Sequence, residues 1–275
     1  MNVKSFKFFL APMEDITSNA FRTLCFRYGA DITFTELSRV ESLSKNNKST
    51  WSRIILKDNT PTIIQLLGAK ESDFKRFLSA FKPSEGFEGF NLNLGCPSPH
   101  VVRLGQGCAM TRRIMKTKKV IEIFHNYGFK ISVKLRLGLN KQDKQLKIYL
   151  NLIDAVDADF FVVHTRFGAQ TYEEPADFSV YEDCVKTGKK IVANGDIKTR
   201  EQVDYLKNMG IKGVMIGRAA VVNPAIFNQI RGLPVPDIET LKKEYAILAE
   251  KFNEPPKYKK NFLKHVSSLK QIHEP

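Results

Sequence analysis

Residues 189–219, "KKIVANGDIKTREQVDYLKNMGIKGVMIGRA", contain two short apolar runs on either side of one amphipathic segment. The runs "KKIVANGDI" (189–197) and "IKGVMIGRA" (211–219) carry several β-branched residues, as buried parallel strands do. The segment between them, "REQVDYLKNMG", has helical spacing and ends on a glycine that suits a helix C-terminus. A strand, a helix and a second strand in this order predict a parallel β–α–β unit.

The same alternation extends back to the start of the chain. Segments with helical spacing, such as "TSNAFRTLCFRYG" (17–29), separate six earlier strand-like runs. These runs cover residues 6–13, 31–37, 60–68, 89–97, 129–138 and 158–166. Eight strand–helix repeats are the number that closes a (β/α)8 barrel. The sequence therefore predicts an α/β fold of the TIM-barrel type.

Each apolar run ends in polar residues, glycine or proline. In a barrel these strand ends meet on one face, where active sites lie. The residues at these ends are Pro12, Met13, Glu14, Glu36, Gln65, Asn93 to Cys96, Lys134, Arg136, His164, Arg166, Asn194, Gly195, Asp196, Gly217 and Arg218. We expect them to line one common mouth.

The composition changes after residue 232. A proline-rich linker, "GLPVPD", precedes two segments with helical spacing, 238–252 and 258–273. We therefore expect a barrel domain over residues 1–232 and a short helical appendage over residues 233–275.

Charge and composition limit which binding partners and which cellular compartment we expect. The 275 residues carry a net charge of +14, which favours polyanions, nucleic acid first and an anionic membrane surface second. Residues 101–120 hold six basic residues and no acidic one, and 251–270 hold six lysines with aromatic neighbours. No apolar segment approaches the roughly 20 residues of a transmembrane helix. Four dispersed cysteines indicate neither a metal site nor a disulfide scaffold. The expected protein is cytoplasmic, without metal and not bound to a membrane.

Three features of the predicted mouth suggest chemistry. Gly195, Gly217 and Arg218 could bind a phosphate through backbone amides and a guanidinium group, although ordinary glycine turns would have the same sequence. Lys134 is expected to point into the barrel, where it needs either a salt-bridge partner or an anionic cofactor. Cys96, between Gly95 and Pro97, should expose a thiol that holds its proton near neutral pH and can donate it.

The combined motifs resemble the tRNA-dihydrouridine synthases, a flavin-dependent family that reduces specific uridines in tRNA. In chain order they are "LAPMEDIT", "FTEL", "IIQLLG", "NLNLGCPS", "SVKLRLG", "VVHTRFGAQTY", "VANGDI" and "VMIGRAA", which together span most of residues 8–224. The resemblance implies FMN as cofactor, NADPH as reductant and tRNA as substrate. It makes Cys96 the donor of a proton to C5 of a flipped-out uracil whose C6 receives a hydride. The basic stretches would hold the tRNA backbone, and we expect a monomer.

The resemblance also assigns the other residues of the mouth. The FMN-binding residues would be Pro12, Met13, Glu14, Gln65, Lys134, His164, Asn194, Gly195, Asp196, Gly217 and Arg218. Within this set, Lys134 would face the N1 and O2 side of the flavin, and the last five would hold the phosphate. Asn93 and Arg166 would bind the uracil.

Some residues depart from the family pattern, and two other functions stay open. Thr165, Phe167 and Cys108 stand where other residues are usual in the family, and the appendage is shorter than is typical. A dihydroorotate dehydrogenase would also be an FMN barrel acting on a pyrimidine, but it would leave the basic stretches without a role. A non-catalytic RNA-binding barrel would need neither Lys134 nor Cys96.

Overall fold

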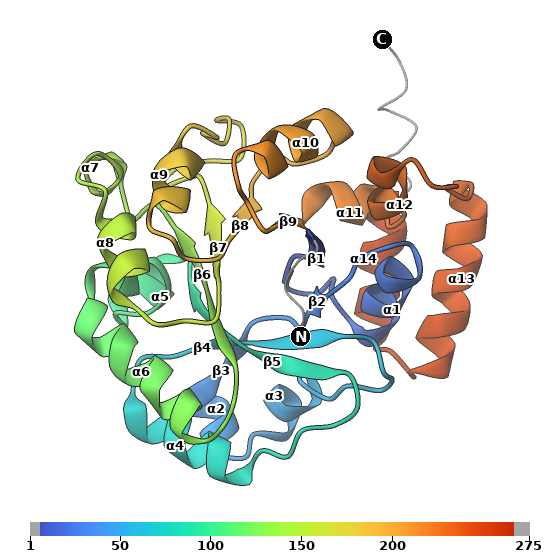
Figure 1. Cartoon of the computed structure of the whole chain (residues 1–275). Helices are drawn as coiled ribbons and strands as arrows, with labels where there is room; N and C mark the ends of the chain where they lie inside the picture. Colours follow the sequence, from blue (N-terminus) through green and yellow to red (C-terminus); the bar gives the residue numbers. More distant parts are fainter. Residues whose placement is uncertain (1–5, 267–275) are drawn as a thin grey trace.

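The computed structural model describes residues 6–266 and confirms the predicted barrel (Figure 1). Within these residues, nine strands form one sheet in the order β1-β9-β8-β7-β6-β5-β4-β2, and β3 also pairs with β4. All pairs are parallel. The ring closes between β1 and the segment before β2, where the Leu10 amide donates to the Ile32 carbonyl at 2.9 Å.

The strands are β1 (Lys7–Leu10), β2 (Thr33–Phe34), β3 (Ser38–Arg39), β4 (Thr62–Leu67), β5 (Phe87–Leu94), β6 (Ile131–Arg136), β7 (Phe161–His164), β8 (Ile191–Asn194) and β9 (Gly213–Ile216). The helices of the first half are α1 (Asn19–Arg27), α2 (Val40–Ser44), α3 (Lys48–Ser52), α4 (Glu71–Ala80), α5 (Pro99–Arg103), the 3-10 helix η1 (Gly107–Arg112) and α6 (Ile114–Asn126). Those of the second half are α7 (Lys141–Gln145), α8 (Ile148–Ala155), α9 (Val180–Lys186), α10 (Arg200–Asn208), α11 (Arg218–Val222), α12 (Ile226–Arg231), α13 (Ile238–Lys251) and α14 (Pro256–Val266).

The second predicted strand, residues 31–37, differs from the expectation. Only Thr33–Phe34 of this run form a strand, β2, and β3 follows at Ser38–Arg39. Both strands pair with β4 and together occupy one barrel position. The division falls at Thr35, whose hydroxyl accepts the Gln65 amide hydrogen at 3.0 Å. A side chain therefore takes the place that a backbone carbonyl would have in a continuous ladder.

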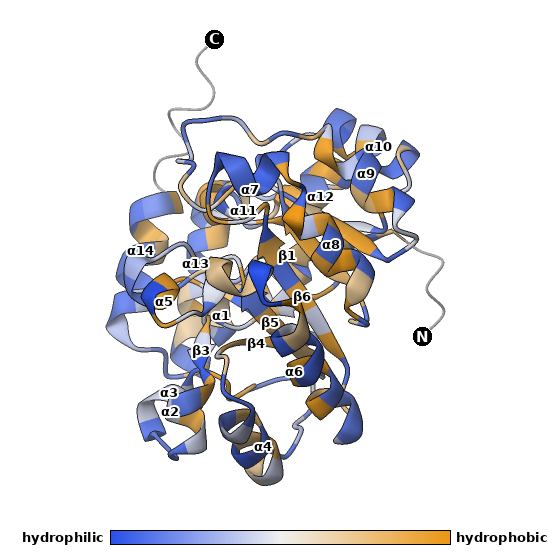
Figure 2. Ribbon diagram, turned by 90° about the vertical axis from the view of Figure 1, so that its left-hand side faces the viewer, coloured by the Kyte–Doolittle hydropathy of each residue, from blue (hydrophilic) through white to orange (hydrophobic). Residues whose placement is uncertain are grey.

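The barrel interior has two layers. The lower layer is an apolar cluster of Phe9, Ala11, Phe34, Ile63, Val162, Val192 and Met215. Because alternate residues of a strand face the same side, the residues two positions further on point into the same interior. Gln65, His164 and Asn194 follow Ile63, Val162 and Val192 in this way. Figure 2 shows hydrophobic residues concentrated on the strands and hydrophilic residues on the outward helix surfaces. The polar layer thus lies above the apolar one, toward the carboxyl ends of the strands.

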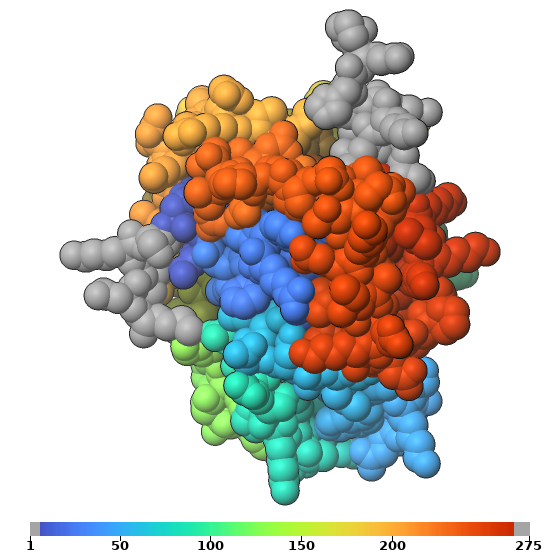
Figure 3. All heavy atoms as spheres, turned by 90° about the vertical axis from the view of Figure 1, so that its right-hand side faces the viewer, coloured from blue at the N-terminus to red at the C-terminus, as the bar shows by residue number. Residues whose placement is uncertain are grey.

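The C-terminal helices α13 and α14 pack on α1 and share the main core of the barrel. The rings of Tyr245 and Phe262 stack with centroids 3.8 Å apart, and Phe262 also meets Phe21 of α1 edge-on. In Figure 3 the orange and red surface of these helices lies directly against the blue surface of the N-terminal segments. The end of the second predicted appendage helix, after residue 266, lies outside the described residues.

Helix α14 also reaches the rim of the barrel mouth. Lys257 forms an ion pair with Asp15 in the loop after β1, and the Asn261 amide donates to the Asp15 carbonyl at 3.0 Å. Tyr258 donates to Glu36, just after β2. A basic helix therefore lies beside the ends of the first two strands. Among residues 6–266, no helix has both the length and the apolar character that crossing a bilayer requires.

Candidate active site

Cys96 lies immediately after β5 and is held by Asn93. The Oδ1 atom of Asn93 accepts the amide hydrogens of Gly95 at 3.0 Å and of Cys96 at 2.9 Å. These two bonds turn the chain sharply away from the strand. The Cys96 side chain is partly exposed, whereas Cys25, Cys108 and Cys184 are buried. Cys96 is therefore the one thiol of the four that is accessible.

A row of amides crosses the polar layer beneath Cys96. Asn93 Nδ2 donates to Gln65 Oε1 at 2.9 Å, and Gln65 Nε2 donates to Asn91 Oδ1 at 2.8 Å. Asn91 Nδ2 then donates to the Ser132 hydroxyl at 2.8 Å. Each bond fixes the orientation of the next amide, so the support of the cysteine turn is rigid. Gln65 keeps one amide hydrogen and one lone pair for a bound group.

Lys134 is the neighbour of Asn93 on β6, since the two residues are register partners. Its side chain makes no hydrogen bond or ion pair with any of the described residues, although it is partly buried. Burial, together with the nearby charge of Arg136, lowers its pKa to about 8. A partly buried cation without an anionic partner fits a site that receives an anionic or electron-rich ligand.

His164, at the end of β7, is buried among cationic groups. Burial, followed by the charges of Lys134, Arg136, Arg166 and Arg218, lowers its pKa to about 2. The imidazole is therefore neutral at physiological pH. Gly195 lies against this ring with φ of +121°, and a Cβ atom there would come within 2.9 Å of His164 Cδ2. Only glycine fits between the end of β8 and the imidazole.

Asp196 joins two arginines at the end of β8. It forms ion pairs with Arg166 and Arg218, and its Oδ2 atom accepts the Ala176 amide hydrogen at 2.9 Å. Burial alone would raise the pKa of this carboxyl, but the bonds from Arg166 and Ala176 and the charges of both arginines outweigh it and lower the pKa. Asp196 is therefore ionised, and it orients the two guanidinium groups.

Arg166 lies deeper than its predicted contact with uracil suggests. Its side chain is 0% exposed. Its Nε atom donates to the Glu174 carbonyl at 2.7 Å, its Nη2 atom contacts the Tyr172 carbonyl and Asp196, and its Nη1 atom lies 3.3 Å from His164 Nε2. At most one N–H of the five remains for a ligand.

Tyr172 was not predicted from the sequence to belong to the site. Its half-exposed ring stacks on His164, and the guanidinium carbon of Arg218 lies 4.3 Å from the ring centroid. Arg136 and Arg166 lie 5.5 and 5.6 Å from the same centroid. Arg136, two residues after Lys134, was expected to line the mouth. Tyr172 could not be predicted, because it lies in a loop without periodicity.

The loop after β1 brings Met13 next to β9. A Cβ atom at Gly217 would lie 3.6 Å from the Met13 sulfur, and Thr17 closes the loop through hydrogen bonds to the Met13 backbone. The Glu14 side chain is 69% exposed and turns toward Arg53, at 3.5 Å. The Glu14 carboxylate therefore points toward Arg53, and the expected contact of this loop with a cofactor stays a prediction.

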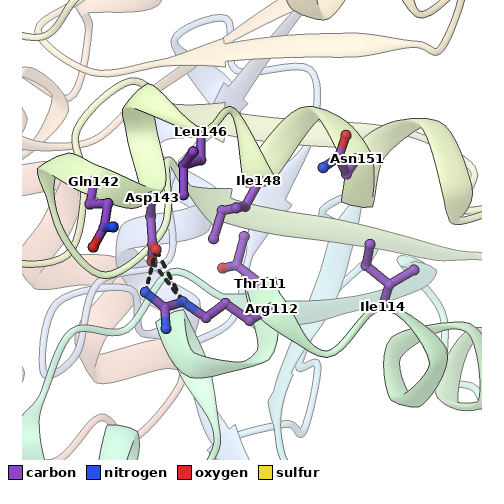
Figure 4. A pocket seen from close by; sticks show the side chains of 8 residues that line it. All are labelled: Thr111, Arg112, Ile114, Gln142, Asp143, Leu146, Ile148 and Asn151. Carbon is purple, nitrogen blue, oxygen red and sulfur yellow. Dashed lines mark hydrogen bonds and ion pairs between the residues drawn. The ribbon is translucent and has the colours of Figure 1, made fainter.

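A cavity of about 410 Å³ lies outside this mouth, between η1 and the helices α7 and α8 (Figure 4). None of its lining residues is a predicted site residue. They are Thr111, Arg112, Ile114, Gln142, Asp143, Leu146, Ile148 and Asn151. Among residues 6–266 no group of three or more His, Cys, Asp or Glu side chains could hold a metal ion.

Residues 9–274 match the sequence profile of a family described as dihydrouridine synthase. The chain belongs to the dihydrouridine synthase family. A probable tRNA-dihydrouridine synthase of Helicobacter pylori is 31% identical over 248 residues, which are 87% of this chain and 74% of that protein. A human tRNA-dihydrouridine(47) synthase-like protein is 26% identical over 230 residues, 82% of this chain. The match spans 35% of the human protein, so this dihydrouridine synthase family member covers about a third of that relative.

Solved structures with a similar fold show the barrel alone. Morphinone reductase in complex with tetrahydroNAD superposes with a TM-score of 0.52 at 10% sequence identity, over 86% of this chain and 90% of that one. A likeness at this level of identity supports the (β/α)8 architecture of the family member and not its chemistry.

Proposed function

We propose that the protein is a flavin-dependent tRNA-dihydrouridine synthase. It reduces the C5–C6 double bond of a uridine in tRNA, with NADPH as the source of electrons. The observation that carries the proposal is the pairing of Cys96 and Lys134. The accessible thiol is fixed by Asn93, and the register partner of Asn93 is a cation without an anionic partner. Family membership supports the same reaction.

The residues of the mouth fit FMN. Lys134 would lie beside the electron-rich edge of the ring system, and Gln65 has one donor and one acceptor for its pyrimidine edge. The backbone of Pro12, Met13 and Glu14 would contact the ring, and His164 would offer it an uncharged hydrogen-bonding group. Bound FMN would supply the hydride for C6 of the uracil.

The phosphate of FMN would bind where β8 and β9 end. Gly195 and Gly217 allow close approach of the backbone, and Arg218 offers a half-exposed guanidinium group. Asn194 is held by a bond from its Nδ2 atom to the Met215 carbonyl at 2.9 Å, which ties the two strand ends together. Because a carboxylate repels a phosphate, Asp196 would act by orienting Arg166 and Arg218.

Cys96 would act as the general acid. After a hydride adds to C6 of a uracil, negative charge develops on C5 and O4, and a protonated thiol placed over C5 can neutralise it. Asn93 fixes the turn that carries this thiol and would also contact the uracil. The one N–H of Arg166 that remains would face the same base. A uridine within folded tRNA must leave its stack to reach this mouth.

The substrate proposal is supported by the two basic stretches at the rim. Helix α14 lies beside the ends of β1 and β2, and residues 101–120 follow the Cys96 turn after β5. Both stretches present exposed lysine or arginine side chains, such as Lys259, Lys260, Arg103 and Arg113. Phosphate contacts of this kind would hold tRNA over the mouth.

The test is a single turnover with two candidate substrates. Protein reconstituted with FMN and reduced by NADPH is mixed under exclusion of oxygen with tRNA that lacks dihydrouridine, or with orotate. We expect tRNA to oxidise the flavin and to gain two mass units at one uridine, and orotate to do neither. Oxidation by orotate alone, or by neither substrate, would contradict the proposed function.

A further inference from the structure

An ion pair connects the loop that carries Cys96 to the loop that follows Lys134. The Nε atom of Arg112, the last residue of η1, lies 3.0 and 3.2 Å from the two carboxylate oxygens of Asp143 in α7, and its Nη2 atom contacts Oδ1 (Figure 4). The Asp143 side chain is 1% exposed. Guanidinium–carboxylate pairs in which several N–H groups are engaged fix geometry as well as charge.

Asp143 is built into its own loop. Its Oδ2 atom accepts the Leu139 amide hydrogen at 2.7 Å, and its own amide donates to the Asn140 side chain at 3.0 Å. Gly138 lies so close that a Cβ atom there would collide with the Asp143 side chain. The buried carboxylate is therefore a rigid anchor for the half-exposed Arg112 side chain.

Hydrogen bonds of η1 connect the segment of Arg112 to Cys96. The Cys108 amide, at the start of η1, donates to the Cys96 carbonyl at 3.0 Å, and the Thr111 hydroxyl donates to the Cys108 carbonyl at 2.8 Å. Gly107 has φ of +56° and packs its backbone against Cys96. Because η1 touches Cys96 at one end and Asp143 at the other, a shift of η1 would move the thiol.

Hydrogen bonds also connect the loop of Asp143 to the cationic side of the mouth. The Gly168 amide donates to the Gly138 carbonyl at 2.8 Å, and the Ala169 amide donates to the Leu139 carbonyl at 2.9 Å. Arg136, on the strand that carries Lys134, donates to the Phe167 carbonyl at 3.0 Å. The loops after β5, β6 and β7 thus form one connected rim, and Arg112–Asp143 is its link between the first two.

We propose that Arg112 and Asp143 are a positioning pair that holds the Cys96 turn in register with Lys134 and thereby places the thiol over the substrate base. This inference rests on the proposed function for its catalytic readout. It assigns Arg112 a role different from that of its neighbour Arg113, which is exposed and forms no ion pair with any described residue. Arg112 would otherwise be one more phosphate contact in the basic stretch.

The test compares Arg112→Ala, Asp143→Asn, Arg112→Lys and Arg27→Ala, each as the full chain with FMN. Arg27, the last residue of α1, is the matched control, because its half-exposed side chain also forms an ion pair, with Glu244. In single turnovers at saturating tRNA, Arg112→Ala and Asp143→Asn should each slow oxidation of the reduced flavin by about 10- to 100-fold, since a misplacement of about 1 Å can cost that much. Reduction of the flavin by NADPH and the dissociation constant for tRNA should change little. Arg112→Lys should recover part of the rate. Arg27→Ala should keep both the single-turnover rate and the dissociation constant for tRNA.

The two roles of Arg112 make opposite predictions for Asp143→Asn. If Arg112 were a phosphate contact, removing the carboxylate would free its charge and tighten tRNA binding without a loss of rate. If the pair positions the cysteine, the double variant Arg112→Ala/Asp143→Asn should lose no more rate than either single variant, because the two residues act through one interaction. Tighter binding with an unchanged rate, or losses that multiply in the double variant, would overturn the inference.

A second readout does not depend on tRNA. Iodoacetamide should alkylate Cys96 in the native protein, because the other three cysteines are buried. Arg112→Ala and Asp143→Asn should raise this rate about fivefold or more, since the local opening of the turn becomes easier, and Arg27→Ala should leave it unchanged. Equal alkylation rates in all variants would overturn the inference even if the protein had no activity on tRNA. An inactive wild-type protein would overturn the proposed function. The alkylation rates would still test whether Arg112 and Asp143 hold the Cys96 turn.

Discussion

The phenolic hydroxyl of Tyr258 donates to the Oε2 atom of Glu36 at 3.0 Å, and both side chains are buried. The bond joins α14 to the end of β2. Burial raises the pKa of Glu36, although the bond from Tyr258 and the charge of Arg53 act in the opposite direction. The other carboxylate oxygen has no hydrogen-bond partner among the described residues. Ionised Glu36 therefore costs stability at the place where the appendage meets the mouth.

Replacing Glu36 should make stability less dependent on pH. An acid whose pKa is raised in the folded protein stabilises the fold fully below its unfolded pKa, about 4.3 for Glu, and this contribution is lost as the pH rises through the folded pKa. Glu36→Gln cannot ionise, so its melting temperature relative to wild type should rise between about pH 4 and pH 7. Thermal unfolding in a series of buffers measures this. Tyr258→Phe should lower the melting temperature at neutral pH, and a constant difference for Glu36→Gln would contradict the raised pKa.

FMN binding should take up protons through Lys134. The free protein has a Lys134 pKa of about 8, and an electron-rich ligand beside the ammonium group should raise it. Affinity should therefore be constant below about pH 8 and fall above it. Titration calorimetry near pH 8 in buffers of different ionisation enthalpy would count the protons. Lys134→Met should bind FMN more weakly and show no uptake while keeping its circular dichroism spectrum, and uptake in this variant would rule out Lys134 as the source.

Cys96→Ala and Cys96→Ser should bind FMN and tRNA and lose turnover. A general acid contributes about 10²- to 10⁴-fold, so the loss should fall in that range. NADPH should still reduce the flavin, which would then react slowly with tRNA in a stopped-flow experiment. Cys108→Ala is the matched control, because burial raises the pKa of Cys108 to about 12 and its side chain is fully buried. A larger loss of turnover in Cys108→Ala than in Cys96→Ala would show that Cys108, and not Cys96, is the general acid.

The salt dependence of tRNA binding should report on α14. The logarithm of the binding constant falls with the logarithm of salt concentration, by roughly 0.7 to 0.9 per phosphate contact. Replacing Lys259, Lys260 and Lys264 together by Ala should flatten this slope, in filter binding over a series of salt concentrations. Lys130, Lys190 and Lys212 provide the control, since all three are exposed and directly precede strands at the opposite end of the barrel. Equal slopes in the two triple variants would exclude α14 as a tRNA contact.

The residues that face the barrel interior could be predicted from the sequence, because the alternation of side chains along a strand depends only on neighbouring residues. The alternation in "SVKLRL" is enough to turn Lys134 into the barrel, and the same rule holds for Gln65, His164 and Asn194. The division of the second strand depended on the Thr35–Gln65 bond, which joins residues of two strands. The burial of Arg166 depended on Glu174 and Asp196, which a loop and a later strand bring to it. Such contacts have no periodic pattern, so the depth of Arg166 and the place of Tyr172 came only from the structure.

The shared core of the barrel and the C-terminal helices limits how this family member could be re-engineered. Tyr245 and Phe262 stack on each other and pack toward α1, and Tyr258 and Asn261 bond to the first two strand ends. A tail transplanted from a relative would meet an α1 surface and a Glu36 shaped for another partner. The unit of exchange between relatives is therefore not the tail alone but the tail together with α1 and the loops after β1 and β2. A chimera that exchanges all of these segments together should fold. A chimera joined at the linker before α13 should expose apolar surface and aggregate.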